Sequence, residues 1–231
     1  MTQPVLQLEK VQFGWAGRRG FSLSVSSFQV AAGETVLLVG ESGSGKSTLL
    51  SLICGTVVPD SGRVSVAGSD ISQLSSRARD KLRAEKIGVI FQQFNLLPFG
   101  NVVDNVLLPL RFAPGRRNRA GDATSAARRL CVALGLPKDV LTEKAHRLSV
   151  GQQQRVAVAR ALIGEPPLIV ADEPTSALDA NTQEAFLDVL FQQAHACSAS
   201  VLMVSHDARL ADRFDRVVEM DEIVVNERPA A

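Results

Sequence analysis

The chain has 231 residues, of which 45% are hydrophobic and 21% are charged, and this composition excludes general disorder. The longest unbroken apolar run, Leu130 to Leu134, is far shorter than the roughly 20 residues of a membrane span, so no span is expected. Twenty-five basic against 24 acidic side chains leave a formal net charge of +1, which gives no sign of a nucleic-acid groove.

The N-terminus and the cysteines indicate a cytoplasmic protein. The first ten residues have no basic stretch that leads into an apolar segment, so no secretory signal is expected. Cys54, Cys131 and Cys197 lie far apart and form no C-x-x-C pair. We interpret them as small, buried hydrophobic residues in a reducing compartment.

Alternating apolar and polar residues dominate the first forty positions. Apolar residues alternate with serines over 21–25 and with polar residues over 28–30, and a bend is expected at Ser26-Ser27 between them. One-sided strands of this kind suit an antiparallel sheet with one solvated face. After a turn at Gly33-Glu34 the pattern changes.

Three continuous apolar runs predict strands that are buried on both faces. They cover residues 35–39, 168–171 and 201–204, and helical patterns lie between them. This alternation predicts a mostly parallel sheet with crossover helices.

The middle third contains no convincing buried strand from about 95 to 163. Apolar residues between 126 and 134 recur at helical spacing, and Gly135 and Pro137 provide a helix stop. The segment 113–119 has loop composition, and its arginines favour an exposed, solvated loop over a phosphate-binding or lipid-binding patch. The expected fold class is therefore α/β, with a mostly parallel core sheet, an N-terminal antiparallel β subdomain and an all-helical insertion.

A glycine-rich loop follows the first buried run and fits G-x-x-x-x-G-K-[ST]. Its residues are Gly40, Glu41, Ser42, Gly43, Ser44, Gly45, Lys46 and Ser47, followed by Thr48. Such a loop points backbone N–H groups at phosphate oxygens, and the next helix adds its positive N-terminal end. Lys46 can reach the β- and γ-phosphates, and the Ser47 hydroxyl can bind Mg²⁺. The alternative, a flexible glycine turn, is disfavoured because strand and helix patterns flank the loop.

Polar residues follow three other apolar runs. Asp172 and Glu173 end the second run, so Asp172 can hold Mg²⁺ while Glu173 faces the attacking water; the alternative is an acidic turn before Pro174. His206 follows the third run, where it can hydrogen-bond a γ-phosphate rather than act as a surface residue. Gln92 follows the run 87–91, which by itself leaves its role open.

The segment Leu148-Ser149-Val150-Gly151-Gln152 resembles the signature loop of the ATP-binding cassette family, usually LSGGQ. The family's other motifs follow the expected order from about Leu6 to Asp221: the phosphate loop, Gln92, this signature, the strand ending at Asp172-Glu173, the segment 176–179, and His206.

This resemblance implies an ATPase in which two copies enclose two ATP molecules. Ser149 and Gly151 of one copy would then face the γ-phosphate held by Lys46 of the other, and Gln152 would belong to the same nucleotide-binding site. The resemblance further implies Glu173, His206 and Gln92 as catalytic residues. It implies Ser47, Gln92 and Asp172 as ligands of Mg²⁺.

Residues 83–98 and 105–110 look like the branch that serves lipoprotein release and macrolide-type export. This branch implies a permease in a separate chain, a homodimer in the ATP-bound state, and a peripheral position on the inner face of the cell membrane. We expect one ATPase domain over 1–231, with an α/β core over 1–94 and 164–231 and a helical subdomain over about 95–163.

Three positions depart from the family pattern. Val150 replaces a glycine of the signature, and Asp221-Glu222 lacks a glycine at the final turn, so an irregular C-terminal strand is expected. Trp15 stands where the family's adenine-stacking tyrosine falls, in a chain without tyrosine. We expect Phe13 on the other strand face, and Trp15 stacked on the base.

Other classes of function remain open. One is a cassette protein that works on nucleic acid, disfavoured by the near-neutral charge and by the single compact insertion between Lys46 and Leu148. Another is a cassette whose ATP cycle drives a mechanical or regulatory partner without transport. The sequence does not identify a cargo.

Overall fold

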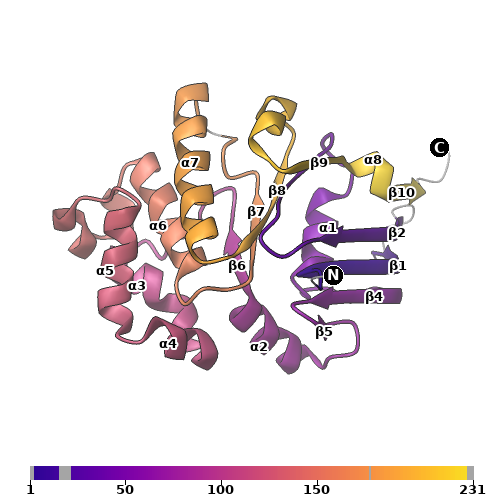
Figure 1. Cartoon of the computed structure of the whole chain (residues 1–231), viewed down its shortest axis with the longest axis horizontal. Helices are drawn as coiled ribbons and strands as arrows, with labels where there is room; N and C mark the ends of the chain where they lie inside the picture. The colour runs from indigo at the N-terminus through magenta and orange to yellow at the C-terminus, as the bar shows by residue number, and fades with distance from the viewer. Residues whose placement is uncertain (1–2, 16–21, 177, 228–231) are drawn as a thin grey trace.

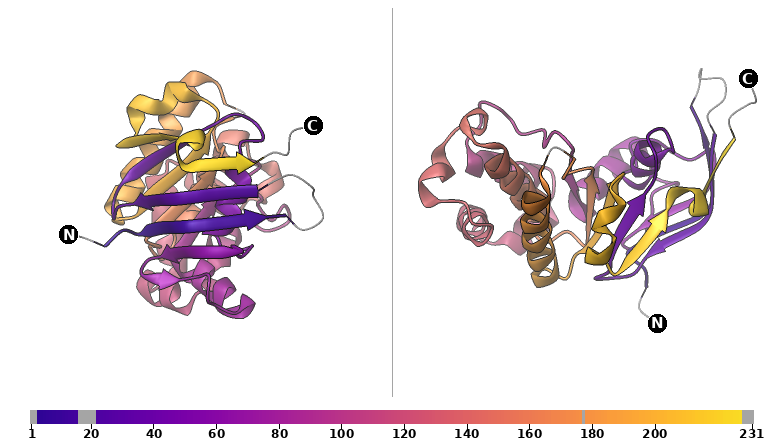
Figure 2. Two further views of the ribbon diagram at one scale, coloured as in Figure 1. Left: turned by 90° about the vertical axis from the view of Figure 1, so that its right-hand side faces the viewer. Right: turned by 90° about the horizontal axis from the view of Figure 1, so that it is seen from above.

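The computed structural model describes residues 3–15, 22–176 and 178–227. Two sheets lie side by side, and a group of helices covers the outer side of one of them (Figures 1 and 2). The strands are β1 (Leu6–Gly14), β2 (Ser22–Val30), β3 (Thr35–Val39), β4 (Ser61–Val66), β5 (Ser69–Asp70), β6 (Ile87–Ile90), β7 (Leu168–Asp172), β8 (Ser200–Ser205), β9 (Arg216–Glu219) and β10 (Val224–Glu227).

The α-helices are α1 (Lys46–Ile53), α2 (Ser76–Lys86), α3 (Val102–Leu107), α4 (Pro114–Ala120), α5 (Ala123–Ala133), α6 (Val150–Leu162), α7 (Ala180–Ala196) and α8 (Met220–Ile223). Short 3₁₀ helices are η1 (Leu108–Arg111), η2 (Lys138–Thr142), η3 (Ala145–Arg147) and η4 (Ala208–Arg213). No helix in the described part of the chain is both long and apolar enough to cross a membrane.

The core sheet has the order β6-β7-β8-β3-β9, and its paired strands are parallel. Successive residues of β3 enter two different cores: Leu37 and Val39 pack with the outer helices, whereas Val36 and Leu38 pack with α1 and the other sheet. The predicted strands buried on both faces are therefore confirmed. The carboxyl ends of β3, β7 and β8 meet at one edge, where the candidate site lies.

The second sheet is antiparallel, with the order β10-β2-β1-β4-β5. Its buried side chains face α1 and the core sheet, which confirms the predicted antiparallel subdomain. The bend predicted at Ser26-Ser27 is wrong, because both serines are exposed within the continuous strand β2. Phe21, part of the predicted alternation, lies outside the described residues.

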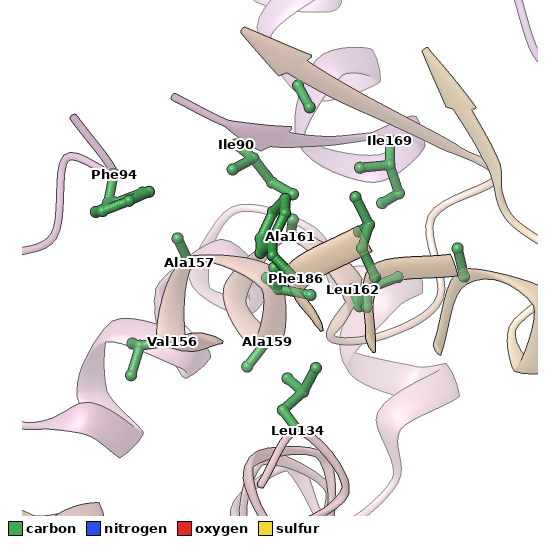
Figure 3. Packing of buried hydrophobic residues seen from close by; sticks show 14 of the residues in the cluster. Ile90, Phe94, Leu134, Val156, Ala157, Ala159, Ala161, Leu162, Ile169 and Phe186 are labelled. Carbon is green, nitrogen blue, oxygen red and sulfur yellow. The ribbon is translucent and has the colours of Figure 1, made fainter. Parts of the chain in front are cut away.

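Helices α3 to α6 form the predicted helical insertion. Helix α5 ends where the sequence predicted, with Gly135 in a left-handed conformation (φ +73°) just after it. Helix α6 is buried on several sides: Ala157 and Ala161 are turned toward Ile90 of the sheet, and Ala159 is turned toward Leu134 (Figure 3). This packing fixes the helix that carries the signature motif at its start.

The segment predicted as a solvated loop at 113–119 is instead helix α4, which begins at Pro114, a residue that the first turn of a helix tolerates. Arg116 is 1% exposed. Its guanidinium donates hydrogen bonds to the carbonyls of Ile163, Ala161 and Ala84 at 2.6–3.2 Å. Burial lowers the pKa of Arg116 to about 10. The loop prediction was wrong because these acceptors are far away in the sequence.

Replacing Arg116 with methionine is expected to destabilise the protein by about 2–4 kcal/mol, because it leaves several buried carbonyls without a donor. Chemical denaturation measures the loss. Arg117→Met is the matched control, since Arg117 is exposed on the same helix. This substitution should change the free energy of unfolding by less than about 0.5 kcal/mol. Equal stabilities for the two variants would contradict the structural role of Arg116.

The C-terminal segment passes from one sheet to the other. Strand β9 pairs in the core sheet, the single turn α8 follows it, and β10 pairs with β2 in the antiparallel sheet. Asp221 and Glu222 lie in α8, so a helical turn replaces the tight hairpin. The expectation of an irregular C-terminal strand is wrong, because β10 pairs with β2 in an unbroken register. The prediction that all three cysteines are buried holds for Cys131 but is wrong for Cys54 and Cys197, which are half-buried.

Candidate functional site

The phosphate loop connects β3 to α1 at the carboxyl edge of the core sheet. Gly43 (φ +83°) and Gly45 (φ +102°) adopt left-handed conformations, and Gly45 is the N-cap of α1. A side chain at Gly40 would collide with Met220 at 2.8 Å. These glycines permit a tight turn that leaves the first backbone N–H groups of α1 open to an anion.

Lys46 is buried at the start of α1. Its ammonium group donates hydrogen bonds to the carbonyls of Gly40 and Glu41 at 2.6 and 2.9 Å, and it lies 3.7 Å from Oε1 of Glu173. The lysine is thus held across its own loop, with its charge directed at the site of the predicted phosphates.

The predicted carboxylates and histidine meet at the same edge. Glu173 directly follows β7, has φ +44°, and donates its N–H to the Val204 carbonyl of β8 at 2.9 Å. Its Oε2 lies 2.8 Å from Nδ1 of His206, so its carboxylate sits between His206 and Lys46. The sequence placed His206 near a phosphate but did not predict its contact with Glu173.

Asp172 is half-buried at the end of β7. Burial raises the pKa of its carboxyl group, repulsion from Glu173 raises it further, and Lys46 opposes both effects. A cation beside this group would relieve both the burial cost and the repulsion. Hydroxyl, amide and carboxylate oxygens such as those of Ser47, Gln92 and Asp172 are the hard donors that Mg²⁺ prefers.

Gln92 comes two residues after β6, is exposed, and donates from its amide to the Ser176 hydroxyl at 3.2 Å. This contact links Gln92 to the segment that follows Glu173. Ala177, in the same segment, lies outside the described residues. The chain then continues into α7, which Asp179 caps by accepting hydrogen bonds from Thr182.

Trp15 lies against the phosphate loop. A cavity of about 320 Å³ is lined by this tryptophan together with Ser42, Gly43, Gly45, Lys46, Ser47, Thr48 and Glu173. The Trp15 indole donates to the Thr48 hydroxyl at 3.2 Å. The expectation that Phe13 points away from Trp15 was wrong: the rings make an edge-to-face contact with centroids 5.1 Å apart. Residues two apart on a strand share a face.

The signature residues do not line this cavity. Ser149 is the N-cap of α6: its hydroxyl accepts from the Gln152 N–H, and the Gln152 side chain accepts from the Ser149 N–H. Val150 is exposed beside them, and a side chain at Gly151 would contact nothing within 4 Å. Helix α6 lies on the far side of the core sheet from α1 (Figure 1).

The sequence did not predict two structural features near the site. Ser176 was noted only as part of a motif, although it is the partner of Gln92. Phe94 and Asn95 are consecutive non-glycine residues with positive φ, 57° and 46°. Asparagine tolerates this conformation better than most residues, but phenylalanine carries no such signal.

Comparisons with known proteins agree with this architecture. The family model described as "ABC transporter" matches residues 23–176. The chain is 44% identical to the lipoprotein-releasing system ATP-binding protein LolD of Anaeromyxobacter dehalogenans, over 83% of this chain and 79% of that protein. It is 41% identical to the macrolide export ATP-binding/permease protein MacB 1 of Aeromonas hydrophila, over 99% of this chain but 35% of that protein.

A solved structure has the same fold. The dimeric, post-hydrolysis structure of the ATP-binding cassette MJ0796 bound to ADP and Pi is 32% identical and superimposes with a TM-score of 0.75, covering 98% of this chain and 99% of that chain. Together with the phosphate loop, the carboxylates beside it and the signature at the start of α6, these matches show that the chain belongs to the ABC transporter family of ATP-binding proteins.

Proposed function

We propose that this chain is the ATP-hydrolysing subunit of a transporter or envelope machine, and that Glu173 is its general base. The observation that carries the assignment is the position of Glu173, between Lys46 and His206 and on the wall of the phosphate-loop cavity. A carboxylate held there can accept a proton from a water that attacks the γ-phosphate. His206 fixes the orientation of the carboxylate through Oε2.

The donor set fits Mg²⁺ bound with the nucleotide. Ser47, Asp172 and Gln92 would hold the ion, which supplies neutralisation of the phosphate charge when bound. Lys46 would move its hydrogen bonds from the loop carbonyls to the β- and γ-phosphates. The backbone N–H groups of residues 42–48 would cradle the phosphate oxygens.

The signature residues would act in a second copy of the chain. Ser149, Gly151 and Gln152 lie outside the phosphate-loop cavity of their own chain, at the exposed start of a helix of 13 residues. A helix N-terminus attracts phosphate. Two copies arranged head to tail would place each signature on the ATP of the other, as the dimeric state of the MJ0796 cassette suggests.

Trp15 would stack on the adenine. Its side chain is 38% exposed, and Phe13 and Thr48 contact it. Replacing Trp15 with alanine is expected to weaken ATP binding by roughly 1–3 kcal/mol, the range for base–aromatic stacking. A flat ring does not read base edges, so ATP and GTP should bind with similar affinity.

Intrinsic fluorescence measures this binding directly, because Trp15 is the only tryptophan. Adding nucleotide should change the emission in a saturable way, and Trp15→Tyr should restore most of the affinity that Trp15→Ala loses in calorimetry. If the emission stays unchanged at saturating ATP and Trp15→Ala binds like the wild type, Trp15 only caps the edge of the sheet.

The partner would be an integral-membrane permease. The macrolide-export relative is named as both ATP-binding and permease, and this chain spans 35% of its length. A groove of about 840 Å³ runs between α2 and η1, with Phe91 and Phe112 on its wall. Five basic residues line it against one acidic residue, Asp80, so it fits a short apolar permease segment that carries a carboxylate. The basic residues are Arg77, Lys81, Arg83, Arg116 and Arg160.

Phe112→Glu is expected to abolish copurification with the detergent-solubilised permease while ATPase activity of the isolated subunit stays within about twofold. Phe112 is 66% exposed, so the fold tolerates the change, but a buried carboxylate in the interface is costly. Val132→Glu, at an exposed apolar position on α5 outside this groove, is the matched control. Retention of the permease by Phe112→Glu would exclude this groove as the docking site.

The subunit would therefore sit peripherally on the cytoplasmic face of the membrane. The proposed single domain spans 1–231, with the helical subdomain over about 95–163 between the two parts of the core. No nucleic-acid partner is proposed.

A further inference from the structure

Two consecutive residues near the site have an unfavourable backbone. Phe94 and Asn95 both lie in the left-handed region, which phenylalanine rarely adopts without support and asparagine adopts more readily. The Phe94 side chain is buried in the core, near Ala157 of α6 in Figure 3. These two residues come directly after Gln92 and Gln93, so their conformation sets the direction in which the Gln92 segment leaves β6.

Arg160 of α6 holds this backbone. Its Nη1 donates to the Asn95 carbonyl at 2.7 Å and its Nη2 to the Phe94 carbonyl at 2.5 Å. A guanidinium is a planar fork, so it can bind two successive carbonyls at once, which a lysine ammonium on a flexible stem does not reproduce. The two hydrogen bonds oppose the relaxation of both residues toward ordinary φ values.

Burying the Arg160 guanidinium costs free energy, so its position indicates that the Phe94–Asn95 backbone needs it there. The side chain is 7% exposed, and none of the described carboxylates lies within ion-pair distance of it. A buried cation without a counter-ion is rare and expensive. Burial lowers the pKa of Arg160 accordingly. The backbone carbonyls of Phe94 and Asn95 are the acceptors that offset this cost.

Helix α6 connects two parts of the proposed site. It starts at the Ser149 cap, and Arg160 stands eleven residues later, about 16 Å along the axis at 1.5 Å per residue. Arg160 binds the carbonyls of residues 94 and 95. Just before these residues, Gln92 donates a hydrogen bond to Ser176, close in sequence to Asp172 and Glu173. A shift of α6 as its N-terminus meets a phosphate would move Arg160, and with it the segment that presents Gln92.

We propose that Arg160 is a positioning residue of the ATPase reaction: it holds the Phe94–Asn95 backbone so that Gln92 is presented to the site, and it couples that presentation to the helix of the signature motif. The inference rests on the proposed catalytic role of Gln92. It predicts a defect in turnover rather than in nucleotide binding, because Arg160 does not line the phosphate-loop cavity.

The test measures KM for MgATP and kcat per functional nucleotide-binding site. The number of functional sites is determined by titrating the Trp15 fluorescence with nucleotide. Arg160→Met is expected to lower kcat about tenfold or more with KM changed by less than about threefold. Asn95→Gly alone should be near wild type, because glycine adopts φ +46° freely. The double variant should recover most of the lost kcat, which a purely structural role of Arg160 does not predict.

Two further variants complete the test. Arg116→Met removes another buried guanidinium that binds carbonyls at the end of α6 but does not touch the Gln92 segment, so its kcat per site should stay near wild type, with or without Asn95→Gly. Asn95→Val keeps Arg160 but disfavours positive φ, and it should reproduce the loss of turnover even if Arg160→Met fails to fold.

The outcomes separate this inference from the proposed function. Wild-type kcat per site in Arg160→Met, or in Asn95→Val where Arg160→Met does not fold, would overturn the role of Arg160. A loss in Arg160→Met that Asn95→Gly does not reverse would overturn it too. The proposed site itself fails only if Glu173→Gln, assayed in parallel, hydrolyses ATP at the wild-type rate.

Discussion

Glu173→Gln is expected to slow ATP hydrolysis by about 10²–10⁴-fold, the usual loss when a positioned base is removed, while ATP still binds. The carboxylate of Glu173 is fixed on both sides, by His206 at 2.8 Å and by Lys46 at 3.7 Å, and its backbone is tied to Val204. The amide of glutamine has nearly the same shape, so the cavity should keep its form. It cannot, however, take a proton from water at neutral pH.

Loss of the negative charge should not weaken nucleotide binding. Glu173 repels phosphate oxygens and attracts the ammonium of Lys46, which the nucleotide also needs, so its neutralisation leaves Lys46 more available. A second consequence is expected at the level of assembly: a closed dimer that cannot hydrolyse its ATP should accumulate. Size-exclusion chromatography of Glu173→Gln should therefore show a dimer with MgATP and a monomer without it.

Glu165→Gln is the matched control for this experiment. Glu165 is another glutamate with a positive φ, 54°, but it is exposed in the turn after α6 and outside the phosphate-loop cavity. Its turnover should equal that of the wild type. Near-wild-type hydrolysis by Glu173→Gln would show that another group acts as the base, and a dimer that forms equally without ATP would contradict an interface built around the nucleotide.

The parts of the fold that sequence predicted well depend on local pattern. The run 35–39 is apolar without alternation, which is typical of a strand covered on both faces. Once three such strands are parallel, the residues after them must meet at one edge, which is why Asp172, Glu173 and His206 could be placed together before their contacts were known.

The features that sequence did not predict depend on partners far away in the chain. Arg116 belongs to a polar segment, and nothing within that segment shows that carbonyls of residues 161 and 163 will surround its guanidinium. The left-handed conformation of Phe94 is held by Arg160, 66 positions later. Polar contacts of this kind leave no periodic pattern of apolar residues in the sequence, so a segment that makes them is predicted from its composition to be a loop.

Ser149→Arg is expected to abolish MgATP-dependent dimerisation and to lower turnover by at least about 100-fold. In this structure the Ser149 hydroxyl caps α6, and Val150, 54% exposed, and Gly151 stand at an open helix start. If a phosphate of the other copy approaches there, a long cationic side chain would block the approach and pair with the phosphate at the wrong distance. The loss of the cap should cost only about 0.5–2 kcal/mol of stability.

Val150→Gly separates this effect from a general sensitivity of the loop. The contacts proposed at the signature are made by the Ser149 hydroxyl and by backbone N–H groups, and they do not depend on which side chain stands at position 150. The turnover of Val150→Gly should therefore stay within about threefold of the wild type. Ser149→Arg should still bind one nucleotide per monomer by Trp15 fluorescence, since Ser149 does not line that cavity. If Ser149→Arg dimerises normally with MgATP, the signature does not face the nucleotide. If Val150→Gly is much faster than the wild type, the valine acts as a brake on closure.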